Sequence, residues 1–278
     1  MNWQANLDPW EQVCRRLACD GSEQGLRLAI LAAHPDDETI GASRLLARFP
    51  QSPVVFLTDG APRDPSLWSA GVKGSRDEYR ETRRGEAERA LSQAGVGEEK
   101  IFWLGGVDQE AVYETGALAE RFRAILSELR PSLIVTHAYE GGHPDHDAAS
   151  LVARIASTCE GRRPPLLLEM ASYHAQEGRR VTGTFLENGV RPELVLELSP
   201  RDRERKRRMM DAYRSQRPVL EGFPIDSERL RPAPEYDFSR PPHPGKLWYE
   251  SMGWDLTGRA WRELAAAALG KRPEHRWA

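Results

Sequence analysis

The sequence has 278 residues, enough for one α/β unit with an appendage and for a hydrophobic core that needs no disulfide bonds. Hydrophobic residues make up 40% and charged residues 29%, which excludes a chain that is disordered throughout. The formal net charge is -3, with acidic and basic residues interspersed, and this argues against a nucleic-acid-binding protein. The one basic run, residues 201–208, indicates a solvated helix face.

Cysteine usage and the N-terminus indicate the compartment. Cys14, Cys19 and Cys159 form no CxxC pair, and an odd number of cysteines does not indicate a disulfide framework. The first residues lack the basic and then apolar pattern of a secretory signal, and no apolar run is long enough to cross a bilayer. We therefore expect a soluble cytoplasmic protein without a membrane span.

Short apolar runs alternate with helical patterns along the chain. Residues 1–25 are expected to form an N-terminal arm or helix. Strands are predicted at residues 26–33, 53–58, 101–104, 132–136, 166–171 and 194–198. Helices are predicted at residues 38–49, 75–94, 115–129, 143–158 and 200–213. This alternation predicts an α/β fold, a Rossmann-like, mostly parallel sheet with helices on both faces, over a body of residues 26–216.

Residues 217–278 have a different texture, dense in proline and aromatic residues. This composition indicates an extended C-terminal segment packed on the body, with a last amphipathic helix at residues 257–269. Its aromatic side chains either pack or form a roof over a pocket or a subunit contact, and packing is the favoured interpretation. They are Tyr236, Phe238, Trp248, Tyr249 and Trp254.

The first chemical motif, HPDDE at residues 34–38, directly follows the first predicted strand. In a parallel sheet, ligands bind beyond the carboxyl ends of the strands. The His34 imidazole and a carboxylate suit a cation such as zinc. Of the adjacent residues Asp36 and Asp37, one can bind the metal while the other stays free to accept a proton from water. The alternative is that both aspartates only cap the following helix.

The second motif, HPDH at residues 143–146, directly follows the fourth predicted strand. If it opens a helix, His143 and His146 are three residues apart and share one face. Gly141 and Gly142 before it allow a tight turn or a close approach of the backbone. The two motifs together predict a metal site with three protein ligands, a spare carboxylate and a spare imidazole.

The segments AHPDDETIG (33–41) and GGHPDHDAA (141–149) resemble the two signature motifs of the LmbE-like or PIG-L family of zinc-dependent N-acetylglucosaminyl deacetylases. Arg83 and Glu86, then the stretch FWLG at residues 102–105, then Asp108, follow in the order found in that family. The segment after residue 217 matches the family less clearly.

The resemblance implies a role for each motif residue. His34, Asp37 and His146 would bind one Zn²⁺ per chain. Asp36 would be the general base that acts on metal-activated water. His143 would be the charged or proton-donating partner of the tetrahedral intermediate and the leaving amine.

The resemblance also implies supporting residues. Asp145 would orient one of the imidazoles. Arg83 and Asp108 occupy the positions of sugar contacts. Tyr139, the nearest tyrosine before the second motif, would help to hold the oxyanion if the Gly-Gly turn folds it back, and local packing is the alternative.

Three further histidines carry weaker signals. A structural role is favoured over a site role for His137, which ends the fourth strand, and for His174. A surface role is favoured for His243.

The activity implied is hydrolysis, by a metal-dependent N-deacetylase, of the N-acetyl amide of an N-acetylated sugar or sugar conjugate. Two alternatives stay open: a metal-dependent amidase acting on a non-sugar N-acyl compound or thiol conjugate, and a catalytically inactive binding member of the family. A nucleotide-binding Rossmann-like protein is disfavoured because no GxGxxG follows the first strand. Other divalent transition metals suit the same ligands, and a homo-oligomer is compatible with the sequence.

Overall fold

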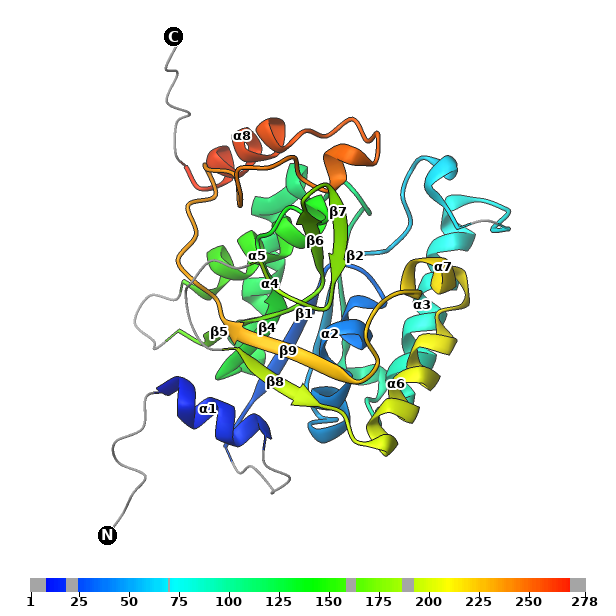
Figure 1. Cartoon of the computed structure of the whole chain (residues 1–278), viewed down its shortest axis with the longest axis vertical. Helices are drawn as coiled ribbons and strands as arrows, with labels where there is room; N and C mark the ends of the chain where they lie inside the picture. The colour runs from blue at the N-terminus through cyan, green and yellow to red at the C-terminus, as the bar shows by residue number, and fades with distance from the viewer. Residues whose placement is uncertain (1–8, 19–24, 70, 159–163, 187–192, 271–278) are drawn as a thin grey trace.

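A seven-stranded sheet forms the centre of the computed structural model, which describes residues 9–18, 25–69, 71–158, 164–186 and 193–270 (Figure 1). The strand order is β3-β2-β1-β4-β5-β9-β8. The first five in this order are parallel: β1 (Leu28–Ala32), β2 (Val54–Thr58), β3 (Ile101–Gly106), β4 (Leu133–His137) and β5 (Leu166–Met170). The predicted α/β fold with a mostly parallel sheet is confirmed.

Helices cover both faces of the sheet, so every residue of β1, β2 and β4 is buried. One apolar layer contains side chains of four helices, α1 (Pro9–Ala18), α2 (Asp37–Arg48), α3 (Arg76–Gln93) and α6 (Pro200–Ala212). The layer on the other face contains side chains of three, α4 (Thr115–Leu129), α5 (Pro144–Ser157) and α8 (Gly258–Ala268). The remaining helical turns are η2 (Pro65–Leu67), η3 (Glu98–Lys100), η4 (Ala111–Glu114), η5 (Arg214–Gln216), α7 (Arg217–Leu220) and η6 (Tyr249–Ser251).

A separate hairpin of β6 (Tyr173–Gln176) and β7 (Arg179–Thr182) lies outside the main sheet and was missed by the sequence reasoning. The two residues between its strands, Glu177 and Gly178, both have positive φ, 51° and 75°. Such turns usually carry Asn-Gly or Asp-Gly, so the Glu-Gly pair gave a weak signal.

The segment after residue 217 does more than pack on the body. Strand β9 (Ser227–Pro232) pairs antiparallel with β5 on one side and with β8 (Leu194–Glu197) on the other. The sequence analysis predicts no strand here, because the charged residues of β9 hide the apolar pattern. Beyond β9 the chain crosses to the α4 and α5 side, where Trp261 of α8 donates a hydrogen bond from Nε1 to the Pro144 carbonyl at 3.0 Å.

At the N-terminus, helix α1 accounts for part of the expected arm or helix, and residues 1–8 and 19–24 lie outside the described residues. Cys19 and Cys159 lie outside them as well. Among the helices that the structure describes, none combines the length and the apolar character needed to cross a membrane.

A buried ion pair joins α2 and α6 to β9. Lys206 Nζ lies 3.2 Å from Glu228 Oε1 and donates a hydrogen bond to the Ile40 carbonyl at 2.6 Å, and both charged side chains are fully buried. Glu228 Oε1 also accepts the backbone N–H of Ser43 at 2.9 Å. A charge at this depth is tolerated only while its partner is present.

Lys206→Met is therefore expected to lower the free energy of unfolding by about 3–5 kcal/mol, because it leaves the Glu228 carboxylate buried without a cation. Urea unfolding measures the change. As a matched control, Arg259→Met breaks an ion pair with Glu263 whose side chains are 85% and 56% exposed, and it should cost less than about 1 kcal/mol. An equal loss of free energy of unfolding in the two variants would show that burial of the Lys206–Glu228 pair does not increase its contribution to stability.

Candidate metal centre

The two sequence motifs meet at the carboxyl edge of β1 and β4, which are neighbours in the sheet. The chain leaves β1 into α2 on one face and leaves β4 into α5 on the other, and this reversal opens a crevice at the edge. His34 and Asp37 come from the β1 side, and His143 and His146 come from the β4 side. Asp108 joins them from the turn after β3.

Three of these side chains form a compact donor group. His34 Nδ1 lies 3.2 Å from Asp37 Oδ2, and His146 Nε2 lies 3.2 Å from Asp37 Oδ1. Their ligand atoms all lie within 4.8 Å of one another, and all three residues are buried. Two ligands of a tetrahedral zinc ion, each ~2.0–2.1 Å from it, are separated by about 3.3 Å. The donor set therefore fits a divalent metal in both chemistry and spacing.

A second group, made of His34, Asp108, His143 and Asp145, meets the same distance criterion. The Asp145 carboxylate, however, already accepts backbone N–H groups from Gln109 at 2.6 Å and from Ala111 at 3.2 Å. It also lies 3.1 Å from His34 Nε2 and is absent from the residues that line the adjoining cavity. These contacts favour the first group as the ligand set and leave Asp145 in an orienting position behind His34.

Asp36 lies beside the donor group in an unusual backbone conformation, with φ at 130°. Positive φ is costly for a residue with a Cβ and persists only where neighbours hold it. The Asp36 N–H donates to Glu38 Oε2 at 2.9 Å, and the Asp36 carboxylate lies 3.2 Å from Arg83 Nη2. Asp36 makes no side-chain cap bond to α2, so its helix-capping alternative is not what the structure shows. Burial raises the pKa of Asp36 to about 7, although the nearby Arg83 charge opposes the shift.

Glu38, which accepts the Asp36 N–H, is itself held in place by two hydroxyl groups. Its other oxygen, Oε1, accepts the Tyr213 hydroxyl at 2.7 Å and the Thr39 hydroxyl at 2.5 Å, and all three side chains are buried. Tyr213 follows the last residue of α6, so a distant helix braces the first motif. Glu38 stands in the first motif, but no local pattern in the sequence points to its contact with Tyr213.

Arg83, expected as a sugar contact, makes most of its hydrogen bonds to the protein backbone. Its Nη2 donates to the Pro35 carbonyl at 2.5 Å and its Nε donates to the Gly60 carbonyl at 3.2 Å, while only 2% of the residue is exposed. Burial acts to lower the pKa of Arg83, but the Asp36 carboxylate and other neighbours raise it, so the side chain stays charged. Arg83 borders the cavity and positions the first motif at the same time.

His143 begins α5 as its N-cap residue and accepts the Asp145 backbone N–H on Nδ1 at 3.1 Å. A neutral ring in this position carries its proton on Nε2. Burial, followed by the neighbouring His34, lowers the pKa of His143 to about 3. The geometry therefore favours a neutral His143 ring that donates a hydrogen bond from Nε2 over a charged partner.

The carboxylates and imidazoles compensate one another electrostatically. Burial acts to lower the pKa of His34, but Asp108, 3.3 Å from Nε2, raises it, and the net shift is well upward. Burial acts to raise the pKa of Asp37, but His146 and His137 lower it, and the net shift is well downward. Asp37 is therefore held as a carboxylate, the form that binds metal.

Tyr139 is not at the site, and its expected oxyanion contact is wrong. Its hydroxyl donates to the Arg240 carbonyl at 2.8 Å, and its ring stacks on Trp261 with 5.2 Å between the centroids. The Gly-Gly turn instead brings the chain close to β6. Gly141 has a φ of 69°, and a Cβ added to Gly142 would lie 2.0 Å from the Tyr173 carbonyl oxygen.

Tyr173 lines the cavity, and its ring makes an edge contact with His146 with 5.2 Å between the centroids. Tyr173 was not predicted at the site because the hairpin that carries it was not predicted. Arg180, on the same hairpin, also lines the cavity.

The other histidines behave as structural residues. His137 accepts the Ala33 N–H on Nε2 at 3.0 Å and stacks on His146 with 4.0 Å between the centroids, so it supports a ligand from behind. His174 lies 3.6 Å from Glu140, and His243 accepts the Gly245 N–H at 3.1 Å. Neither lines the cavity.

The cavity above the donor group has a volume of about 190 Å³ and is bordered by His34, Asp36, Asp37, Asp108, His143 and His146, among others. Trp248 and Trp254, two aromatic residues of the C-terminal segment, also line the cavity. Packing therefore does not account for all the aromatic residues of that segment. Trp254 makes an edge contact with His143 at 4.9 Å. Tyr236 and Phe238 pack against Tyr139 in the core, as expected.

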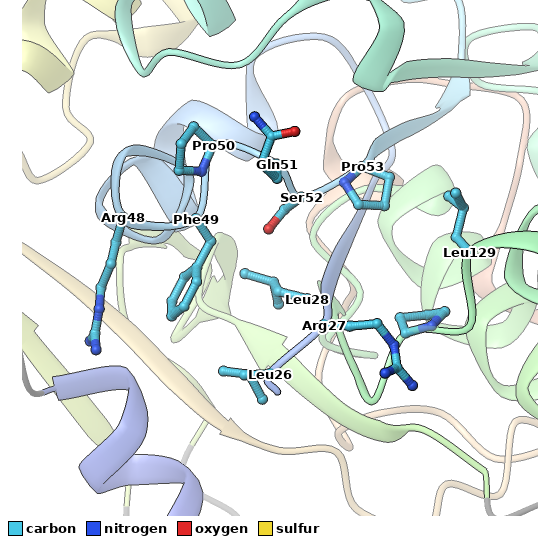
Figure 2. A pocket seen from close by; sticks show the side chains of 11 residues that line it. Leu26, Arg27, Leu28, Arg48, Phe49, Pro50, Gln51, Ser52, Pro53 and Leu129 are labelled. Carbon is cyan, nitrogen blue, oxygen red and sulfur yellow. The ribbon is translucent and has the colours of Figure 1, made fainter. Parts of the chain in front are cut away.

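A different cavity, of about 360 Å³, is drawn in Figure 2. Its lining includes Leu28, the first residue of β1, and Pro53, which precedes β2, so it lies at the amino ends of these strands. Its labelled side chains include Leu26, Phe49 and Arg48, and none belongs to either motif. It is therefore distinct from the metal centre, which lies at the opposite edge of the sheet.

Comparison with known proteins confirms the resemblance seen in the sequence. Residues 29–157 match the family PIG-L, described as GlcNAc-PI de-N-acetylase, and the match includes both motifs. A 1D-myo-inositol 2-acetamido-2-deoxy-alpha-D-glucopyranoside deacetylase from Nocardioides sp. is 29% identical over 164 residues, covering 47% of this chain and 53% of the relative. The protein of the same name from Thermobifida fusca is 30% identical over 160 residues, covering 45% and 52%. The chain spans about half the length of these relatives.

Solved structures share the fold. Teicoplanin deacetylase in a zinc-inhibited form superposes with a TM-score of 0.56 at 18% identity, covering 76% of this chain and 99% of the other. N,N'-diacetylchitobiose deacetylase from Pyrococcus horikoshii gives a TM-score of 0.50 at 18% identity, covering 82% and 95%. At this level of identity the likeness concerns the fold alone.

The two donor groups predict opposite outcomes for two variants. His146 belongs only to the favoured group, and Asp108 belongs only to the other. Purified protein is expected to bind about one Zn²⁺ per chain. His146→Ala should weaken binding by more than about 100-fold, since loss of even an orienting contact costs ~10–100-fold.

Asp108→Asn is the matched control and should retain the metal. Metal content after dialysis, measured by inductively coupled plasma mass spectrometry, distinguishes the two. Retention in His146→Ala with loss in Asp108→Asn would assign the metal to the second group.

Proposed function

We propose that this member of the PIG-L (LmbE-like) family is a metal-dependent N-deacetylase that removes the acetyl group from an N-acetylated sugar or sugar conjugate. The observation that carries the proposal is the Asp36 carboxylate, held next to the His34, Asp37 and His146 donors at the floor of a cavity. The relatives are named as deacetylases of a 2-acetamido sugar, which supports this substrate class.

The size and lining of the cavity support an acetamido sugar. Its volume of about 190 Å³ suits one monosaccharide ring with its acetamido group. Carboxylate, imidazole and guanidinium groups in the lining offer hydrogen bonds to hydroxyl groups, and Tyr173 and Trp248 offer aromatic faces.

His34, Asp37 and His146 would hold the metal, for which we propose Zn²⁺ because two imidazoles and one carboxylate suit that ion. A zinc ion in such a site supplies Lewis acidity and lowers the pKa of water. Asp145, behind His34, keeps the imidazole in its orientation through the 3.1 Å contact with Nε2.

Asp36 acts as the general base. It takes a proton from water while the water oxygen forms a bond to the acetyl carbonyl carbon. The positive φ of Asp36, fixed by Glu38 and Arg83, directs the carboxylate into the cavity and away from the helix that follows. Burial keeps its pKa above the usual range, which makes it a stronger base than an exposed carboxylate.

His143 acts on the carbonyl oxygen of the amide. Its Nε2–H donates a hydrogen bond to the carbonyl oxygen as negative charge develops there, a kind of contact worth about 3–4 kcal/mol in comparable enzymes. As the C–N bond breaks, the leaving nitrogen takes up the proton that Asp36 removed from the water, and the products are acetate and the free amine. One water is consumed for each amide hydrolysed.

Asp36→Asn tests this assignment because it preserves shape but removes the base. Acetate release from N-acetylglucosamine and its glycosides is expected to fall by about 10²–10⁴-fold, while metal content stays at the wild-type level. Tyr139→Phe is the matched control, since its hydroxyl donates to the Arg240 carbonyl and Tyr139 does not line the cavity, and its rate should not change. A wild-type rate in Asp36→Asn would remove Asp36 from the mechanism.

The same assay separates the alternatives. Metal binding without acetate release from any sugar would redirect the search to a non-sugar N-acyl compound or thiol conjugate. Failure to bind metal after reconstitution would favour a catalytically inactive binding protein.

A further inference from the structure

The cavity at the metal centre continues into a wider groove. The outer groove has a volume of about 540 Å³ and is formed by the segment at residues 62–67, the turn at 108–113 and the C-terminal segment at 252–256. The two spaces share six lining residues, Pro62, Leu67, Asp108, Gln109, Met252 and Trp254. A molecule with its acetamido group at the metal centre therefore extends into this groove if it carries a second group.

Exposed apolar side chains gather along the groove. Leu67, Tyr113 and Met252 are 38%, 59% and 48% exposed. They make up half of the six large apolar residues that the described part of the chain leaves exposed. Apolar surface that is left open in one place marks a binding face, and flat rings pack well against it.

The charges of the groove are mainly acidic. Asp64, Asp108, Glu110 and Asp255 line it, against a single basic residue, Arg63. Arg63 is already paired, with its Nε 2.8 Å from Glu110 Oε1. The surplus of negative charge disfavours an anionic group such as a phosphate.

We propose that the outer groove binds the aglycone of the substrate, and that it selects an uncharged ring over a phosphate-bearing group. This proposal rests on the proposed N-deacetylase function of the inner cavity. The ring packs on Tyr113, Met252 and Trp254, and the acidic residues accept hydrogen bonds from hydroxyl groups. A sugar ring and an aromatic ring share this chemistry.

Four glycosides of N-acetylglucosamine test the selection. They carry methyl, glucose, phenyl or phosphate at the anomeric position. Holoenzyme is expected to show kcat/KM roughly tenfold higher for the glucose or phenyl compound than for the methyl compound, and roughly tenfold lower for the phosphate. Preference for glucose over phenyl identifies a sugar aglycone, and the reverse identifies an aromatic one.

Two variants link the selection to the groove. Tyr113→Ala should reduce the preference for the ring-bearing glycosides over the methyl glycoside to near unity. Asp255→Lys should reduce the difference in kcat/KM between the methyl and phosphate compounds. Val195→Ala, which truncates an exposed residue of β8 away from both spaces, is the control and should leave both ratios unchanged.

Titration calorimetry of metal-free protein with the glucose and methyl glycosides adds a readout that needs no turnover. Tighter binding of the glucose compound, lost in Tyr113→Ala, supports the proposal. Equal ratios in wild type and Tyr113→Ala, or equal rates for methyl and phosphate compounds, overturn it while leaving deacetylation intact. If wild type releases no acetate from any glycoside, the proposed function fails, and calorimetry without a preference for the ring then removes the groove as a binding site too.

Discussion

A single buried carboxylate, that of Asp37, joins the two halves of the candidate site. One oxygen faces His34 from the β1 side and the other faces His146 from the β4 side, each at 3.2 Å. A charge at this depth is stable only with compensating partners, and the imidazoles of His34, His137 and His146 surround it. The adjacency of β1 and β4 makes this contact possible, and a divalent cation between the same donors would satisfy it more fully.

The geometry beside Asp37 depends on residues that never reach the cavity floor. Asp36 stays at positive φ because Glu38 accepts its N–H and Arg83 binds the carbonyl before it. Glu38 is in turn held by the Tyr213 hydroxyl at the end of α6. The orientation of the proposed base thus depends on contacts from α3 and α6, and a change in either helix can alter the site without touching a ligand.

Most of the sheet, the helices and the meeting of the two motifs at one edge were predictable from the sequence because they depend on local patterns. Buried parallel strands are continuous apolar runs, and the helix Thr115–Leu129 has the bounds that its apolar spacing predicts. The failures depend on distant partners. Glu228 and Arg231 of β9 are buried beside the opposite charges of Lys206 and Glu169, and Tyr139 lies in the core, where its ring stacks on Trp261. No local pattern in the sequence predicts such partners. The same holds for the hairpin that places Tyr173 at the site.

The most direct test of the metal centre is anomalous diffraction at the zinc edge from crystals of the zinc-loaded protein. We expect one strong peak about 2.0–2.2 Å from ligand atoms of His34, Asp37 and His146, with the Asp36 carboxylate beside it and outside bonding distance. A peak bonded to Asp108, His143 and Asp145 instead, or no peak at this edge of the sheet, would contradict the assignment of ligands and the role of Asp36 that depends on it.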